Sequence, residues 1–563
     1  MNLLSHRQGG ARARTLIVGA LALFVWGAAL VRASQVFAPD SIYVQPFNSD
    51  SALPVLMAND PTLDVFRTYI YGQDQIGAWS FLICQLIHGA TGYVWTDRSV
   101  FRLQVFGLFL SVPLVAGLCR RASLAAGALL LAVICLHPTV SHYVFVLNQR
   151  YAWQLTALFF AWWSLRRLCA RRFELPGRAR TPRILWHLLA FFSSLLAVWT
   201  SPLSAPMLAT FLALEVARAR IIARDAASAA RFSAARILSC ALPLIIAILV
   251  EQLLKANYHR HALKHFGTDF RTPTQVDWGY LATNLRAQLA NFTHASLWWL
   301  TLPALALAPF AAVWLLRGII RRDDDDRAHA ASRFPSEGAR LDLCVLLVGS
   351  LAVASINFAS AVVFQWIRLN LYGGRYLALT HLFGTFAGAL ALLLLLMLPP
   401  KVYAARRTVF AAVMLAIVLM LALKFPPVRK NPEYETLRRV AAGLAEKNPR
   451  AVLLGGYWDT YVFAALRPAD AFTPVPAEDQ LLRTPWTPRV MREADEVVVV
   501  HHVFPDTGEF ETPPPYNTFG DGREPPPVIR QYGATLRLET PRWYEHDGYV
   551  FSLYRNVTDR TAR

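Results

Sequence analysis

Long apolar runs recur along this chain of 563 residues, and they constrain its fold more than any other feature. A helix needs about 17–25 apolar residues to cross a hydrocarbon core about 30 Å thick. The chain is 55% hydrophobic, a share that soluble domains seldom reach. We therefore predict an all-α polytopic membrane protein with about eleven transmembrane helices. The expected ranges are 15–33, 101–119, 122–140, 152–166, 183–201, 203–217, 237–254, 297–316, 341–364, 376–398 and 408–425.

Arginine is unevenly distributed among the connections between these runs. The net charge is +19, and basic residues crowd into alternate connections such as HRQGGARAR, RRLCARRFELPGRARTPR and RGIIRRDDDDRAHAASR. Cytoplasmic loops carry such an excess of Lys and Arg. We expect a cytoplasmic N-terminus, a retained first helix and, with an odd number of spans, an external C-terminus. Because orientation accounts for the charge, we predict no nucleic-acid partner. The Ala- and Arg-rich composition indicates a bacterium with a GC-rich genome, and hence its inner membrane.

The composition and hydrophobic pattern of the sequence change near residue 430. Residues 1–429 hold the apolar runs and a long, acidic first outer loop at 34–100. Residues 430–563 begin with the helical pattern NPEYETLRRVAAGLAEKNP and continue with the strand-like segments AVLLGG, EVVVVHHV, GATLRLET and GYVFSLYRN. We predict a transmembrane domain followed by a periplasmic α/β domain. Within the outer loop, GQDQIGAWSFLICQLIHGATGY has the pattern of a helix lying in the membrane interface.

Acidic residues cluster in the first outer loop, beside the lipid headgroups. The stretch QPFNSDSALPVLMAND contains Asp50 and Asp60, and Asp74 follows it. A carboxylate at this depth is costly unless it is solvated, paired or used. NSDS and NDPT are good capping and turn sequences, so a solvated helix cap is one interpretation. Asp50 precedes an apolar segment that returns to the interface, which favours a functional carboxylate.

A carboxylate at headgroup height suits sugar transfer from a lipid carrier. A sugar on a polyprenyl phosphate presents its anomeric carbon at that level. The acceptor hydroxyl needs a base or an oriented hydrogen-bond acceptor, and the departing phosphate needs positive charge. The cations predicted at the same outer face are Arg150, Arg368, Arg375, Lys255 and Lys264.

Four short segments of the sequence form an ordered set. They are FNSDSALPVLMA and YIYGQDQIGAW in the outer loop, GGRYLAL before a late helix, and GYWDTYVFAAL in the tail. This set resembles the GT-C membrane glycosyltransferases, which use polyprenyl-phosphate sugars and include protein mannosyltransferases and aminoarabinose transferases. The resemblance implies a GT-C fold with Asp50 as the catalytic carboxylate, and with Arg375 and Tyr376 holding the donor phosphate.

Further residues are predicted around this site. Arg150 and Arg368 would help to hold the donor phosphate. The predicted substrate-positioning residues are Tyr71, Gln73, Asp74 and His142. Asp74 has an alternative role, capping a helix that begins near residue 76. Candidate acceptor contacts are Trp458, Asp459 and Tyr461, because ligands usually bind after strand ends in α/β domains; the alternative is that they are core and turn residues.

The chain departs from the GT-C pattern where relatives carry additional acids. Ser51 stands where an acid often follows the catalytic Asp, and HPTVSHYVFVLNQRYAW holds no acid. That segment offers His137, His142 and Arg150 instead. We therefore expect chemistry without a tightly bound divalent metal or other cofactor, with Arg150 or a histidine facing the phosphate. For His137, a helix-end histidine before a proline is an equal alternative.

Together these features predict an inverting glycosyltransferase that moves a hexose or pentose to a lipid-linked or cell-surface glycan. The sugar, the acceptor and the oligomeric state are left open. One alternative is a polysaccharide polymerase or ligase that uses lipid-pyrophosphate donors and depends on arginines rather than on Asp50. Another is a lipid-glycan flippase or transporter, which would carry ionisable residues near mid-membrane and a pseudo-repeat; neither is evident in the sequence.

Overall fold

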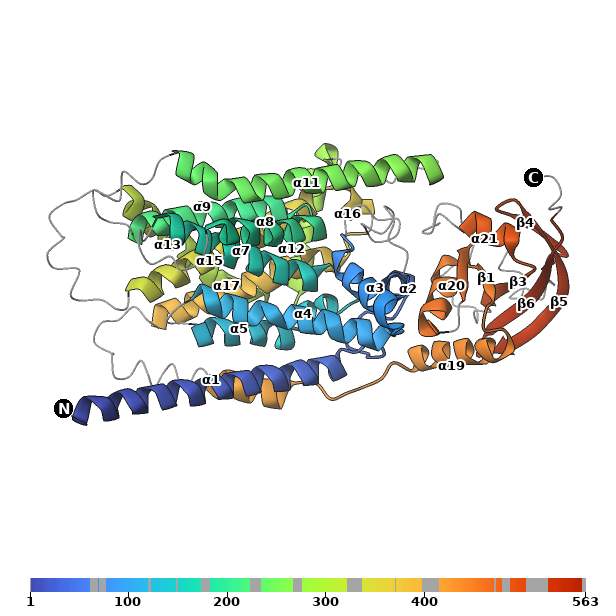
Figure 1. Ribbon diagram of the computed structural model, residues 1–563, viewed down its shortest axis with the longest axis horizontal. Helices are drawn as coiled ribbons and strands as arrows, with labels where there is room; N and C mark the ends of the chain where they lie inside the picture. Colours follow the sequence, from blue (N-terminus) through green and yellow to red (C-terminus); the bar gives the residue numbers. More distant parts are fainter. Residues whose placement is uncertain are drawn as a thin grey trace.

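The protein consists of a long helix bundle joined at one end to a smaller sheet-containing domain (Figure 1). The computed structural model describes residues 2–60, 69, 77–119, 123–147, 150–173, 183–222, 234–266, 276–320, 337–369, 371–396, 415–469, 472–477, 487–502 and 525–558. We call the end of the bundle that meets the smaller domain the domain end. The helices run between this end and the opposite one, so the bundle has the shape expected of a membrane domain.

Each of the eleven apolar ranges expected from the sequence overlaps a helix. The helices are α1 (Asn2–Val36), α4 (Asp97–Leu118), α5 (Ser123–Leu136), α7 (Tyr151–Phe173), α8 (Arg183–Thr200), α9 (Ser204–Ile222), α11 (Ala234–Phe266), α13 (Leu302–Ile320), α15 (Glu337–Val363), α17 (Ala378–Leu396) and Leu415–Lys424. In the described part of the chain, six helices are long and apolar enough to span a membrane. The number is seven if α5 and α6 (Pro138–Val144), bent by 80°, form one span. A membrane protein is confirmed, and the count of eleven stays a prediction.

Charged side chains inside the bundle lower the hydropathy of α7 and α9. Arg218 donates from Nε to Asp342 Oδ1 at 2.9 Å, and Arg166 also binds Asp342. Trp162 donates to Glu215 at 2.8 Å. All four ionisable residues are buried, and their charges cancel. We call them the buried ion cluster. The sequence expectation concerned ionisable residues near mid-membrane, whereas this cluster contacts the last residue of α4, near one end of the bundle.

The buried ion cluster lies away from the domain end. Arg166 also donates to the carbonyl of Leu118, the last residue of α4, whereas the first residue of α4 lies at the domain end. A charge in the membrane interior is tolerated only when it is paired. The cluster therefore lets α7, α9 and α15 carry charges into the bundle without leaving any of them uncompensated.

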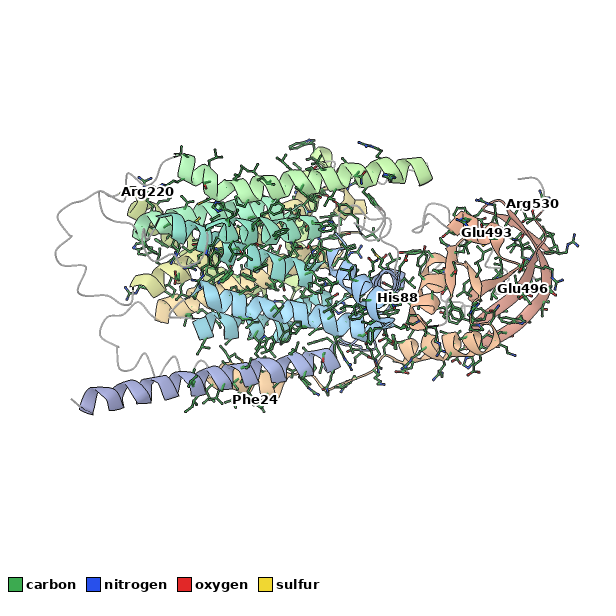
Figure 2. All side chains as sticks on the ribbon, viewed as in Figure 1. Phe24, His88, Arg220, Glu493, Glu496 and Arg530 are labelled. Carbon is green, nitrogen blue, oxygen red and sulfur yellow. The ribbon has the colours of Figure 1, made fainter. Side chains whose placement is uncertain are left out.

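Two short helices, which lie between α1 and α4 in the sequence, cover the domain end of the bundle. They are α2 (Ser49–Ala58) and α3 (Trp79–Thr91). On α3, Phe81 and Cys84 are buried while Ile83 and Leu86 are exposed. His88, in the last turn of α3, lies where the bundle meets the smaller domain (Figure 2). This amphipathic helix with an exposed apolar side agrees with the interfacial helix expected from the sequence.

The C-terminal region forms one mixed sheet with helices against it. Its elements are α19 (Pro432–Lys447), β1 (Val452–Gly455), α20 (Tyr457–Leu466), β2 (Thr473–Pro476), α21 (Thr487–Glu493), β3 (Glu496–His502), β4 (Val528–Gln531), β5 (Ala534–His546) and β6 (Tyr549–Asn556). The strand order is β2-β1-β3-β6-β5-β4. β1 pairs in parallel with β2 and β3, and the remaining pairs are antiparallel. The four strand-like segments of the sequence are confirmed as β1, β3, β5 and β6.

Successive side chains of β1 pack into two different hydrophobic cores, one on each face of the sheet. Leu453 belongs to a core with residues of α19 and α20, whereas Val452 and Leu454 belong to a second core that includes Met491 of α21. Successive side chains of a strand point to opposite faces. The sheet is therefore buried on both sides at β1, and α20 is held on the side that faces the bundle (Figure 1).

Several contacts dock the C-terminal domain onto the domain end. Asn431 donates its backbone N–H to the carbonyl of Asp40 at 2.7 Å. Tyr434 donates its hydroxyl to the buried carboxylate of Asp97, and its ring meets Phe47 edge-on at 5.7 Å. Burial, and then the Asp97 charge, raise the pKa of Tyr434 well above its ordinary value, so its hydroxyl stays a donor. The core of the bundle also continues into α20.

Candidate functional site

Asp50 lies in the first turn of α2, at the domain end. Asn48 is the N-cap of this helix, and its side chain accepts a hydrogen bond from the N–H of Ser51 at 3.1 Å. Because Asn48 caps the helix, Asp50 is not needed for that purpose. The Asp50 carboxylate is half-buried, and its Oδ1 accepts a hydrogen bond of 2.9 Å from the hydroxyl of Tyr457. The geometry thus favours a positioned carboxylate over a solvated cap.

Tyr457 comes from the C-terminal domain. It is the first residue of α20, it directly follows Gly456 after β1, and it is buried. The carboxyl end of a parallel strand is the edge at which α/β folds present functional side chains. Sequence reasoning used this rule to select three later residues of the same helix and missed Tyr457. The signal was present, since Tyr457 is nearer to the strand end than any of them.

Arg375 lies close enough to Asp50 for the two charges to interact. It belongs to the short 3-10 helix η4 (Gly374–Leu377), and its charge interacts with that of Asp50. Its guanidinium donates to the hydroxyl of Tyr376 at 3.2 Å and lies 5.1 Å from the centre of that ring. Tyr151 donates to the backbone carbonyl of Arg375 at 2.6 Å. The structure therefore places Arg375 in contact with Tyr376 and within electrostatic range of Asp50, and the catalytic roles of the three residues stay predictions.

The backbone before Arg375 is strained. Leu371 and Tyr372 have φ angles of 52° and 54°, in the left-handed region that residues with a Cβ rarely adopt. A Cβ on Gly374 would lie 3.1 Å from the hydroxyl of Tyr143, so this position has little room for a larger residue. Strain of this kind persists where the surroundings impose it, and it is common at functional sites. The turn holds Arg375 in a defined place.

Arg150 and Arg368 have different surroundings. Arg150 immediately precedes α7 and interacts electrostatically with Tyr151. Arg368, in α16 (Gln365–Leu369), donates from Nε to Asp277 Oδ2 at 2.6 Å and lies 4.1 Å from the centre of the Tyr280 ring. The hydrogen bond from Arg368 lowers the pKa of Asp277. Arg150 and Arg375 both interact with Tyr151, whereas Arg368 is already paired with Asp277. The roles of Arg150 and Arg368 in donor binding stay predictions.

The two histidines near α6 have structural contacts. His137 is the N-cap of α6, where its Nδ1 accepts from the N–H of Val140 at 3.4 Å. This favours the helix-end interpretation of His137. The Nδ1 of His142 lies 3.2 Å from the carbonyl oxygen of Tyr43, so His142 joins α6 to the segment after α1.

The remaining predicted residues are only partly placed. Tyr71, Gln73 and Asp74 lie outside the described residues, as does the side chain of Trp458. Asp459 accepts a hydrogen bond from Tyr549 of β6, and Tyr461 is fully buried with its ring 5.2 Å from that of Tyr457. These contacts favour core roles for Asp459 and Tyr461. Within the described residues, no group of three or more His, Cys, Asp or Glu side chains is arranged to hold a metal ion.

Comparisons with known proteins give similarities in structure alone. No protein-family model matches the chain, and no curated protein does. The oligosaccharyltransferase of Archaeoglobus fulgidus in its apo form is 12% identical, with a TM-score of 0.44 over 86% of this chain and 69% of that one. ArnT from Cupriavidus metallidurans bound to undecaprenyl phosphate is 11% identical, with a TM-score of 0.40 over 98% and 99%. Because identity and TM-score are low, the function proposed below rests on the geometry of this chain.

Proposed function

We propose that this protein is an inverting glycosyltransferase that moves a sugar from a polyprenyl-phosphate donor to a lipid-linked or cell-surface glycan. The observation that carries the proposal is the carboxylate of Asp50, held by Tyr457 and facing the charge of Arg375 at the domain end. One carboxylate oxygen is bound by Tyr457, which leaves the other for an acceptor hydroxyl. The domain end corresponds to the outer, periplasmic face of a bacterial inner membrane, with the N-terminus in the cytoplasm.

Asp50 acts on the acceptor. The acceptor hydroxyl donates its hydrogen bond to the free oxygen of the carboxylate, which orients it towards the anomeric carbon and accepts its proton as the new C–O bond forms. The acceptor approaches from the side opposite to the phosphate, so the anomeric configuration inverts. The hydrogen bond from Tyr457 limits rotation of the carboxylate and fixes which oxygen reacts.

Arg375 and Tyr376 act on the leaving group. The bond between the anomeric carbon and the phosphate oxygen breaks, and its electron pair leaves with the polyprenyl phosphate. The guanidinium of Arg375 and the hydroxyl of Tyr376 lie 3.2 Å apart, so both can donate to the same phosphate. Arg150, whose charge also acts on Tyr151, adds positive charge to the same region. Placing positive charge where negative charge develops is commonly the largest catalytic effect.

One observation favours the transporter alternative, namely the buried ion cluster. Ionisable residues inside a membrane bundle often mark an ion or substrate pathway. However, both arginines of the cluster bind Asp342, and Glu215 also accepts from Trp162. A mutually neutralised set of this kind has a structural explanation. The positioned carboxylate at the domain end has no comparable explanation, and for this reason we prefer the enzyme.

Asp50→Asn tests the proposal. Membranes with equal amounts of wild type or variant are supplied with polyprenyl-phosphate sugars, and donor consumption and glycan mass are followed. We expect the variant to lose about 10²- to 10⁴-fold in rate, the usual contribution of a positioned base. Asp60→Asn, just beyond the C-terminal end of the same helix, is the matched control and is expected to keep wild-type activity. Equal activity of wild type and Asp50→Asn would refute the proposal and favour the arginine-dependent polymerase.

A further inference from the structure

A basic pocket lies at the domain end, between α1, α4 and the linker that leads into α19. Its volume is about 240 Å³. The residues that define it are Gln35 from the end of α1, Asp40, Arg98 and Arg102 from the start of α4, and Arg429 and Lys430 from the linker. We call it the basic pocket. None of these residues belongs to the site of Asp50 and Arg375.

The basic pocket has more cations than its carboxylates neutralise. Asp40 binds Arg98 at 2.7 Å and lies 3.8 Å from Lys430, and Lys430 also reaches Glu435 at 3.3 Å. Arg102 and Arg429 are exposed, and neither forms an ion pair with another residue in the described part of the chain. Two guanidinium groups are therefore left for an anion. Guanidinium is the group that binds phosphate best, because its planar donors match the phosphate oxygens.

An apolar groove on α1 leads to the basic pocket. It is a shallow, open groove on the surface of α1 alone, lined by Phe24, Gly27, Ala28, Val31 and, nearer the pocket, Arg32 and Gln35. Phe24 lies on the outer side of α1 (Figure 2), and a Cβ on Gly27 would meet no atom within 4 Å. Gln35 lines both the groove and the basic pocket. An alkyl chain in this groove would place its headgroup against Arg102 and Arg429.

We propose that the groove and the basic pocket bind an anionic phospholipid of the membrane, with its phosphate in the pocket and an acyl chain along α1. The pocket lies at the end of α1 and the start of α4, two apolar helices, and therefore at headgroup height, where a lipid phosphate lies. Charge complementarity favours an anionic over a zwitterionic headgroup. The lipid contacts the linker that docks the C-terminal domain, through Arg429 and Lys430. This proposal does not depend on the reaction that the protein catalyses.

Native mass spectrometry of the full chain in detergent tests the proposal. Wild type is incubated with phosphatidylglycerol or with phosphatidylcholine of the same acyl composition. We expect preferential retention of phosphatidylglycerol, and a loss of about tenfold in its apparent affinity in the double variant Arg102→Gln/Arg429→Gln. Arg286→Gln removes one exposed arginine of α12 (Leu281–His294) outside the pocket, and it is expected to retain the lipid.

Three outcomes would overturn the proposal. Equal retention of the two phospholipids would show that the headgroup is not recognised by its charge. Unchanged retention in the double variant, shown to be folded by its unchanged thermal unfolding without added lipid, would place the lipid elsewhere. Displacement of phosphatidylglycerol by millimolar inorganic phosphate would indicate a site for a free anion, since the acyl chain would then contribute nothing.

Discussion

The hydroxyl of Tyr457 and the carboxylate of Asp50 are joined by a hydrogen bond of 2.9 Å, although 407 positions separate the two residues in the chain. The bond connects the C-terminal domain to α2, in the segment that joins α1 to α4. The C-terminal domain therefore completes the proposed active site as well as covering the domain end. Tyr457 is a positioning residue, because in this proposal it acts through the carboxylate and touches no reacting atom.

Replacing Tyr457 by phenylalanine is predicted to lower kcat about 10- to 100-fold and to leave the KM for the donor unchanged. The variant keeps the buried ring and loses only the hydrogen bond to a charged group, which contributes about 1.5–3 kcal/mol. Steady-state kinetics with a polyprenyl-phosphate sugar separate the two parameters. Tyr532→Phe is the control, since it loses a similar hydrogen bond of 2.7 Å to the carbonyl of Pro476 inside the same domain. An equal loss in both variants would mean that Tyr457 acts through domain stability alone.

Arg375→Gln is predicted to lower kcat/KM for the donor by about 100-fold, the usual loss when a donor that stabilises developing charge is removed. Arg375→Lys is expected to recover part of this loss, because it keeps the charge but not the planar set of donors. The bond from Tyr151 goes to the backbone carbonyl of Arg375, so both variants retain it. The measurement is inhibition by polyprenyl phosphate that carries no sugar. This inhibition should be strongest in wild type, weaker in Arg375→Lys and weakest in Arg375→Gln. Unchanged inhibition in Arg375→Gln would remove Arg375 from the phosphate site.

The Asp277–Arg368 pair is predicted to stabilise the protein in a pH-dependent way. The pKa of Asp277 is lowered in the folded protein, mainly by its hydrogen bond from Arg368. The contribution is therefore complete above the ordinary Asp pKa of about 3.9 and is lost as the pH falls through the lower, folded value. The unfolding temperatures of wild type and Asp277→Asn should differ by a constant amount around neutral pH. The two temperatures should converge in acid. A difference that grows in acid would contradict the assignment.

Periodicity and composition predicted much of the fold, because they report on local structure and burial. The apolar runs located the helices of the bundle, and the strand-like segments located β1, β3, β5 and β6. Of the motif residues, Arg375 contacts Tyr376 and its charge interacts with that of Asp50, while their roles in catalysis stay predictions. Partners that depend on long-range packing were not predictable. Nothing near Tyr457 in the sequence indicates Asp50, and nothing near Arg368 indicates Asp277.

The buried ion cluster illustrates the same limit, and its energetics give a further prediction. Its arginines look like members of the basic cytoplasmic loops in sequence, yet both bind Asp342 inside the bundle. Asp342→Asn should destabilise the protein by about 3–5 kcal/mol, because it leaves buried cations without their partner. Glu539→Gln, which breaks the exposed 2.8 Å pair with Arg555, should cost about 1 kcal/mol or less.

A double-mutant cycle measures how much Arg218 and Asp342 stabilise one another, apart from their contacts with other residues. The variant Arg218→Gln/Asp342→Asn removes one charge of each sign, and it should be more stable than the sum of the two single effects predicts. Denaturant or thermal unfolding of the purified protein in detergent gives the change in unfolding free energy for each single variant and for the double variant. Additive effects would mean that Arg218 and Asp342 do not stabilise one another, and that hydrogen bonds to neutral neighbours hold each of them in place.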